Sequence, residues 1–146
     1  HCGLNNKETN RKNSDSRVSE RAAREIYLKA FESIVKEAQP WSIMTSYNRV
    51  NGVHAANSYD LCTKAARDEW GFQGVIMTDW TTTHYGEACT ASGCIRAGND
   101  QIMPGIPQDH ENIRKALEDG SLTPAQLKLA VAHLLAVVFQ SDRYEV

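Results

Sequence analysis

The chain has 146 residues, of which 41% are hydrophobic and 23% are charged, and its formal net charge is -2. This length allows a sizeable core, and the composition is that of a globular protein. The small negative charge argues against a nucleic-acid partner and a basic membrane-binding surface, and no apolar run approaches the length of a bilayer span. Because the chain opens at His1 without a Met or a signal peptide, we expect it to be a piece of a longer protein.

The chain begins with a predicted strand exit, a polar loop and a long helix. Residues 1–6 are typical of a strand that runs into a loop, and residues 9–16 are polar throughout. Apolar residues recur about every four positions from Val18 to Ala38, which predicts an amphipathic helix with Ser16 or Ser19 as its N-cap.

A second strand and a second helix follow. Residues 41–48 predict the strand, and residues 50–52 have the signature of a turn. Asn57 can cap a helix that carries apolar positions as far as Trp70 and stops at Gly71.

The most informative stretch runs from residue 71 to residue 80. The short apolar run 75–77 lies between a glycine and a polar end, which predicts a strand buried on both faces of a parallel sheet. Functional residues gather at the C-terminal ends of such strands, where Asp79 is followed by Trp80. A carboxylate beside an aromatic ring suits covalent or acid–base chemistry on a sugar. Position alone equally allows Asp79 to cap the next loop or to pair with an arginine.

The polar loop 81–87 follows this strand. His84 and Glu87 could face the site from the loop, although a solvated loop is the simpler interpretation. Residues 88–96 predict a short helix, and residues 97–103 predict another buried strand.

Two helices complete the predicted elements. The first spans Asp109–Glu118 and is ended by Gly120. Residues 123–126 form a capping box with a proline at the first helical position, which opens the last helix. A buried stripe is expected along this helix, formed by Leu127, Val131, Leu134, Leu135 and Val138. Helices that alternate with short buried strands predict βαβ units and a parallel sheet.

The cysteines and histidines give no metal signal. Cys2, Cys62, Cys89 and Cys94 form no C-x-x-C pair and no zinc-finger spacing, and the five histidines are scattered. We therefore expect no metal and no cofactor. Cys89 and Cys94 could form a disulfide in a secreted protein, but reduced thiols in a cytoplasmic protein are the favoured interpretation.

The segment Glu69–Trp80 (Glu-Trp-Gly-Phe-Gln-Gly-Val-Ile-Met-Thr-Asp-Trp) resembles the nucleophile segment of glycoside hydrolase family 3, which is best known for β-glucosidases. The family pattern is close to E-W-G-F-x-G-x-x-x-(S/T)-D-W. Three further segments resemble the family in the same order, namely His1–Glu8, Met44–Gly52 and Ala97–Gly105. The resemblance covers nearly the whole chain.

The resemblance implies that residues 1–146 are the second half of the family's (β/α)8 TIM-barrel domain, with the upstream half and the acid/base domain absent. A half-barrel leaves two strand edges and a barrel interior without partners. We therefore expect the chain to be marginally stable, to form a homodimer, or to be completed by the missing half.

The resemblance also implies a retaining β-glycosidase with Asp79 as its nucleophile. His1 would bind sugar hydroxyls, Tyr47 would contact the nucleophile, and Trp80 would pack on the sugar. Without the resemblance, His1 would be a solvated terminus and Tyr47 a packed ring with a wet hydroxyl. Asp100 is the rival strand-end carboxylate, and the family's A-G-x-D segment gives it a part in shaping the site.

No acid/base residue can be assigned in the chain. In the family's β-glucosidases it is a Glu from a separate domain, whereas its N-acetylglucosaminidases use an Asp–His pair in a D-S-H segment. Here Asp15 and Ser16 are followed by Arg17, which favours the β-glucosidase branch. We expect the substrates to be β-linked glucosides or short oligosaccharides, and the isolated chain to be inactive or weakly active.

Two other functions stay open. A catalytically incomplete fragment could act only as a sugar-binding or assembly module. A different TIM-barrel enzyme, such as an aldolase or a dehydratase, would need a Schiff-base lysine or a metal at a strand end. Every lysine of this chain falls in a predicted loop or helix, which disfavours that class.

Overall fold

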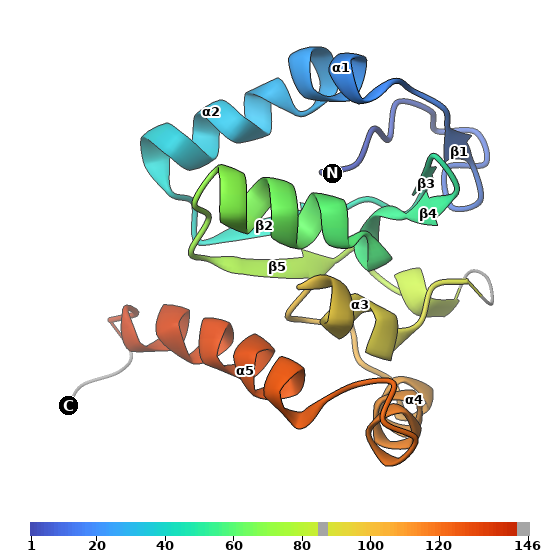
Figure 1. Cartoon of the computed structure of the whole chain (residues 1–146), viewed down its shortest axis with the longest axis vertical. Coiled ribbons are helices and arrows are strands. Elements are labelled where there is room, and N and C mark those ends of the chain that lie inside the picture. Colours follow the sequence, from blue (N-terminus) through green and yellow to red (C-terminus); the bar gives the residue numbers. More distant parts are fainter. Residues whose placement is uncertain (85–87, 143–146) are drawn as a thin grey trace.

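A computed structural model describes residues 1–84 and 88–142 of the chain. Its elements are, in order, β1 (Asp15–Ser16), α1 (Glu20–Ala22), η1 (Ala23–Tyr27), α2 (Lys29–Ala38), β2 (Ser42–Thr45), β3 (Arg49–Val50), β4 (Val53–His54), η2 (Ala55–Asn57), η3 (Asp60–Glu69), β5 (Val75–Thr78), η4 (Thr82–His84), α3 (Ala91–Ala97), α4 (Pro107–Glu118) and α5 (Pro124–Phe139). The helices η1 and η3 are π-helical, while η2 and η4 are 3-10 turns. Figure 1 shows β2 and β5 side by side, with α1 and α2 above them and α3, α4 and α5 below.

The central sheet is parallel. Strands β2 and β5 are paired along their whole length, with Ile43 opposite Ile76. Single parallel bridges extend the pair on both sides, from Cys2 to Thr45 and from Met77 to Gln101. Segments that are neighbours in the sheet therefore follow one another along the chain with helices between them, which is the predicted α/β alternation.

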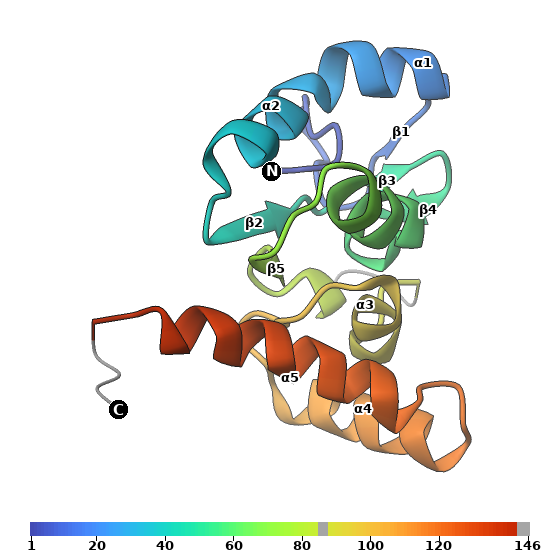
Figure 2. The ribbon, with the colours of Figure 1, turned by 60° about the vertical axis from the view of Figure 1, so that its left-hand side comes forward.

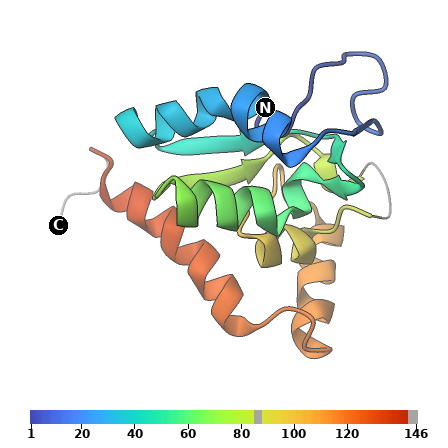
Figure 3. The same ribbon diagram turned by 45° about the horizontal axis from the view of Figure 1, so that its top comes forward.

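Helices α2 and η3 pack on the central sheet. Ile43 and Ile76 belong to a buried cluster with Val35 of α2 and Leu61 of η3. Figure 3 shows the paired strands between these two helices. A second cluster joins α3, α4 and α5, which Figure 2 shows as a group at the bottom of the molecule, away from α1 and α2. The fold is therefore a mixed α/β arrangement with helices packed on parallel strands.

The first long helix is close to its prediction. The Ser19 hydroxyl accepts a hydrogen bond from the backbone N–H of Ala22, so Ser19 is the N-cap. Ser16 instead lies in β1 and donates to the Leu4 carbonyl. The helix ends at Gln39, whose φ of 43° is left-handed, directly before the proline.

The prediction that Asn57 caps the next helix is wrong. Asn57 closes the turn η2, and the hydroxyl of Ser58 accepts from the N–H of Leu61 instead. The Asn57 side chain faces away from the helix end, and its oxygen contacts the thiols of Cys89 and Cys94.

The predicted strand over residues 97–103 is also wrong. Helix α3 continues to Ala97, and Gly98, with a φ of 93°, caps its C-terminus in the left-handed conformation. The following segment touches the sheet through the single bridge at Gln101. The apolar positions that suggested a strand are shared between the end of a helix and a short crossing segment.

The expected buried stripe on α5 is wrong for most of its members. Ala130 is the buried residue of this helix, and Leu127 and Leu134 are half-buried. The other three members are between 44% and 47% exposed, namely Val131, Leu135 and Val138. The helix is apolar around much of its circumference, so its periodicity does not identify the side that packs on α3 and α4.

The four cysteines are free and buried. Within the described ranges, no helix combines the length and the apolar character that crossing a membrane requires.

Candidate active site

The carboxylate of Asp79 is fixed directly after the last residue of β5. Its Oδ1 accepts a hydrogen bond of 2.6 Å from the backbone N–H of Trp80, and its carbonyl oxygen accepts one of 2.8 Å from the Thr82 hydroxyl. Thr81, two residues after Asp79, has a left-handed φ of 62°, so the chain turns sharply away from the strand. Asp79 is buried, with 8% of its surface exposed. This is the strand-end position predicted from the sequence.

The parallel bridge at Cys2 brings His1 to Asp79. The His1 Nε2 atom lies 2.6 Å from Asp79 Oδ2, within ion-pair distance. No described residue gives Oδ2 a hydrogen bond of normal geometry. On the other side of the imidazole, Asn5 Nδ2 lies 3.5 Å from His1 Nδ1. One oxygen of the carboxylate is therefore oriented by the backbone, while the second faces an imidazole that can donate or accept a proton.

Tyr47 and Trp80 complete the set of residues singled out from the sequence. The Tyr47 hydroxyl donates a hydrogen bond of 2.9 Å to the carbonyl oxygen of Trp80, which holds the backbone next to Asp79. Its ring is buried, and its centroid lies 6.2 Å from that of His1 at an interplanar angle of 51°. The Trp80 side chain is 56% exposed. The structure thus brings all four predicted residues into one cluster with a buried carboxylate and an accessible indole.

Two cations beside this cluster were missed by sequence reasoning. The guanidinium carbon of Arg11 lies 5.1 Å from the centroid of the Tyr47 ring, and the Nζ atom of Lys12 lies 5.5 Å from it. Both distances are typical of cation–π contacts. Adjacent basic residues in a polar loop carry no periodic signal, so only the folded loop reveals their place.

Asp100 lies in a different environment. One oxygen of its carboxylate is 2.5 Å from Arg67 Nη2 and accepts from the N–H of Ile76, near the start of β5. The other oxygen lies 2.7 Å from His133 Nδ1 of α5. Asp100 therefore precedes the bridging residue Gln101, and the prediction that it ends a strand as a rival to Asp79 is wrong.

The loop after the site gives little further chemistry. His84 Nε2 lies 3.9 Å from Asp109 Oδ2, and Glu87 falls outside the described residues. Among the residues that the structure describes, no group of three or more His, Cys, Asp and Glu residues is placed to hold a metal ion. The chemistry that the cluster offers is therefore that of one oriented carboxylate with polar and aromatic neighbours.

An α/β domain with an oriented carboxylate after a parallel strand is the arrangement that the glycoside hydrolase resemblance implies. The family model described as "Glycosyl hydrolase family 3 N terminal domain" matches residues 3–137. The chain belongs to glycoside hydrolase family 3.

Curated relatives carry names of glycoside hydrolases. The chain is 50% identical over 127 residues, which is 87% of its length, to an exo-α-(1→6)-L-arabinopyranosidase of Bifidobacterium longum. It is 56% identical over 105 residues, 70% of its length, to β-glucosidase A of Butyrivibrio fibrisolvens. The chain spans 16% of the first relative and 12% of the second, so it matches a small part of each.

Solved structures agree with this assignment. β-Glucosidase 3B of Thermotoga neapolitana superposes with a TM-score of 0.87 at 41% identity, covering 95% of this chain and 20% of that protein. A β-glucosidase of Paenibacillus barengoltzii gives a TM-score of 0.88 at 41% identity, covering 97% of this chain and 17% of that protein.

Proposed function

We propose that this chain supplies the nucleophile and part of the sugar-binding subsite of a retaining β-glycosidase that cleaves terminal β-glucosides. The observation that carries the proposal is the carboxylate of Asp79. It is buried after β5, its Oδ1 is oriented by the N–H of Trp80, and its Oδ2 faces His1. Family membership and the names of the relatives support the substrate class.

In the first step, an oxygen of Asp79 forms a bond to the anomeric carbon while the bond from that carbon to the leaving oxygen breaks. The leaving oxygen takes a proton from an acid that lies outside this chain. Water, deprotonated by the same group, then cleaves the glycosyl ester and restores the carboxylate. In this scheme His1 hydrogen-bonds sugar hydroxyls, and the exposed indole of Trp80 packs on the sugar ring.

Tyr47 acts in this proposal as a positioning residue. Its hydroxyl holds the carbonyl of Trp80, so the backbone that follows the nucleophile is fixed before the sugar arrives. Pre-orientation of this kind lowers the cost of reaching the reactive geometry.

The proposal places the four parallel segments of the chain in the second half of a (β/α)8 barrel. The segments at Cys2 and Gln101, each joined to the sheet by one bridge, lie on its two sides. The upstream half of the barrel, or a second copy of the chain, would pair with these edges. The acid/base would come from a separate domain, because Asp15, in the segment that could have matched the Asp–His type, pairs with Arg17 at 2.8 Å.

The test is trapping of the glycosyl ester. The protein is incubated with a 2-deoxy-2-fluoro-β-glucoside that carries a dinitrophenyl leaving group, and the adduct is located by intact mass and peptide mapping. This leaving group departs without an acid, and the fluorine slows hydrolysis of the ester. We expect one adduct on Asp79, none in Asp79→Asn, and an unchanged adduct in the matched control Asp119→Asn, whose carboxylate is exposed.

Because the isolated chain is expected to be inactive or weakly active, absence of an adduct on Asp79 overturns the proposal if it persists when the upstream half of the barrel is added back, and it then favours the non-catalytic sugar-binding module. An adduct on Asp100 contradicts the assignment of the nucleophile directly.

A further inference from the structure

Helix α5 carries an apolar stripe that the described residues leave open. Val131, Leu135 and Val138 are 45%, 44% and 47% exposed, and their helical spacing puts them on one side of α5. Residues 129–139 contain no Lys, Arg, Asp or Glu. A helix that is apolar around most of its circumference is typical of a buried element. These three residues, the outer stripe of α5, therefore indicate a neighbour that is missing from this chain.

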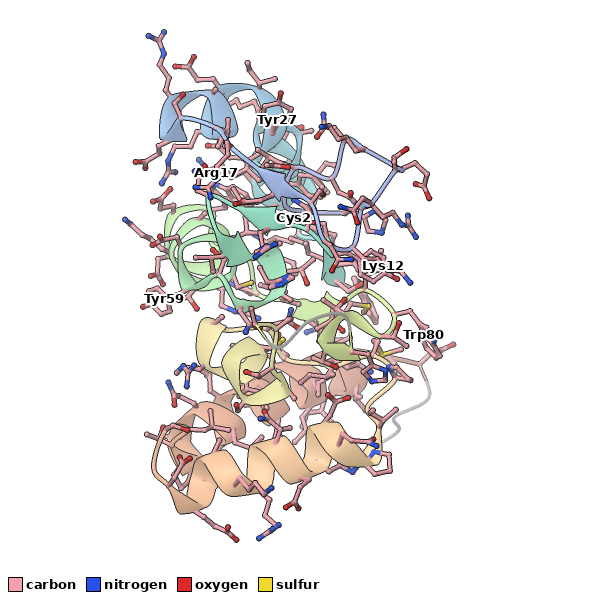
Figure 4. All side chains as sticks on the ribbon, turned by 90° about the vertical axis from the view of Figure 1, so that its right-hand side faces the viewer. Cys2, Lys12, Arg17, Tyr27, Tyr59 and Trp80 are labelled. Carbon is pink, nitrogen blue, oxygen red and sulfur yellow. The ribbon has the colours of Figure 1, made fainter. Side chains whose placement is uncertain are left out.

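The other side of α5 is already packed. Ala130 is buried in a cluster with Ile95 of α3 and Ala116 of α4. His133 Nδ1 lies 2.7 Å from Asp100 Oδ1. Figure 4 shows α4 in front of α5, and Figures 1 and 3 show α5 at the boundary of the molecule. The chain thus uses one side of α5 for its own packing, and the outer stripe lies outside that contact.

Helix α5 also stands next to an open edge of the parallel sheet. Asp100, which contacts His133, directly precedes Gln101, the residue that bridges to Met77 of β5. Among the described residues, no strand pairs with the other side of the Gln101 segment. In a parallel sheet, each added strand brings a helix that covers the sheet beside the preceding helix. A single βα unit could therefore pair with this edge and cover the outer stripe together.

The lengths of the relatives favour a source for this unit. The chain spans 16% of the Bifidobacterium longum arabinopyranosidase and 20% of Thermotoga neapolitana β-glucosidase 3B. Most of each relative therefore lies outside the region that this chain matches. In a closed barrel the last strand pairs with the first, which belongs to the upstream half.

We propose that the outer stripe of α5 is the docking surface for a βα unit of the upstream half of the barrel. Its strand pairs in parallel with the Gln101 segment, and its helix packs an apolar face on Val131, Leu135 and Val138. The docking face must be uncharged, because the stripe offers no partner for a buried charge. This inference rests on the barrel arrangement in the proposed function and names the surface that joins the two halves.

The experiment coexpresses the chain with a defined probe, the part of Thermotoga neapolitana β-glucosidase 3B that precedes the matched region. Leu135→Cys places a thiol on the outer stripe, whereas the four native cysteines are buried. We expect a maleimide to label this thiol roughly tenfold or more slowly in the complex than in the isolated chain, since labelling then requires local opening. The matched control is Val53→Cys on β4, which is 49% exposed and should react equally fast in both.

A second variant tests whether the stripe holds the two halves together. Leu135→Glu should weaken association with the probe roughly tenfold or more, because docking would bury a carboxylate without a partner. Val53→Glu places the same charge at a similarly exposed apolar position and should leave association unchanged. Urea unfolding of the isolated Leu135→Glu chain checks that it still folds.

The possible failures are distinguishable. No association, or an unprotected Leu135→Cys together with normal association of Leu135→Glu, overturns the inference. If the isolated chain sediments as a dimer that Leu135→Glu dissociates, a second copy covers the stripe and the inference is wrong. Labelling of Asp79 by the fluoroglucoside in the complex tests the proposed function separately. An adduct beside an unprotected stripe leaves that function standing, whereas a protected stripe without an adduct overturns the function alone.

Discussion

At the scale of single residues, Asp79 and Asp100 show how surroundings divide two buried aspartates by role. The Asp79 carboxylate has one oxygen with no hydrogen bond from a described residue and lies beside an imidazole. The Asp100 carboxylate has both oxygens engaged, by Arg67, by His133 and by the backbone of Ile76. A carboxylate with an oxygen that accepts no hydrogen bond can react with a ligand. A carboxylate whose two oxygens both accept hydrogen bonds holds elements together.

This contrast predicts different costs for the same substitution. Asp100→Asn should lower the free energy of unfolding by roughly 3 kcal/mol, because it leaves Arg67, whose side chain is only 11% exposed, without its charge partner. Asp79→Asn should change it by less than about 1 kcal/mol, since the backbone N–H of Trp80 can still donate to the amide oxygen. Urea unfolding followed by circular dichroism measures both, and equal losses would contradict the division of roles.

Sequence reasoning located the nucleophile candidate and its neighbours but not the network around Asp100. Asp79 follows an apolar run, so the strand end is visible in the pattern itself. The partners of Asp100 lie 33 residues before and after it, on η3 and α5, and no local pattern links them. Arg11 and Lys12 were overlooked for the same reason, because their meaning depends on a tyrosine of another element.

At the scale of elements, the turn after α3 decides where the chain enters the sheet. Gly98 adopts a φ of 93° there, and the Thr63 hydroxyl of η3 lies where its side chain would be while donating to the carbonyl of Ala97. Gly120 ends the turn after α4 with a similar φ of 77°, but open space surrounds it. The two glycines share a backbone conformation and differ in packing.

Substituting each glycine by alanine separates these two contributions. Gly120→Ala should cost about 1 kcal/mol of unfolding free energy, from the left-handed backbone alone. Gly98→Ala should cost roughly 3 kcal/mol, because a Cβ atom must also displace Thr63 from a packed contact. Thermal or urea unfolding of both variants measures the difference in unfolding free energy. Equal losses in the two variants would show that Thr63 of η3 moves aside without a cost in stability.

Elements with one clear pattern of apolar residues were predicted well. A segment that is part helix and part sheet contact, such as residues 97–103, was not. The buried run of β5 and the helix capped by Ser19 carry clear local signals. Residues 97–103 were assigned to a strand because an apolar pattern does not show where a helix stops, which a backbone turn decides here. The exposed side of α5 could not be anticipated, since burial depends on which neighbours a helix meets.

At the scale of the whole molecule, the buried thiols link stability to pH. Burial raises the pKa of Cys2 from 9.0 to about 12. Burial likewise raises the pKa of Cys62 well above its ordinary value, and a hydrogen bond with Cys89 together with burial raises that of Cys94. The folded protein therefore keeps these protons at pH values where the unfolded chain has released them.

The sign of the effect follows from this difference. Below about pH 8.5 both states keep the thiol protons, so these groups leave the free energy of unfolding constant. Between about pH 9 and 12 each thiol should lower it by up to roughly 1.4 kcal/mol per pH unit. Urea unfolding at a series of alkaline pH values measures the slope, and Cys62→Ala should make it shallower. An unchanged slope in that variant would contradict the role of Cys62.

The order of segments in the sheet also bears on how the chain is made. Each sheet segment pairs with the one synthesised before it, so the sheet can grow as the polypeptide leaves the ribosome. His133 is translated 33 residues after Asp100, which at typical elongation rates is a delay of about 2 to 7 s. During that interval Arg67, already made, is the charged partner that holds Asp100, and the arrival of α5 completes the carboxylate's contacts.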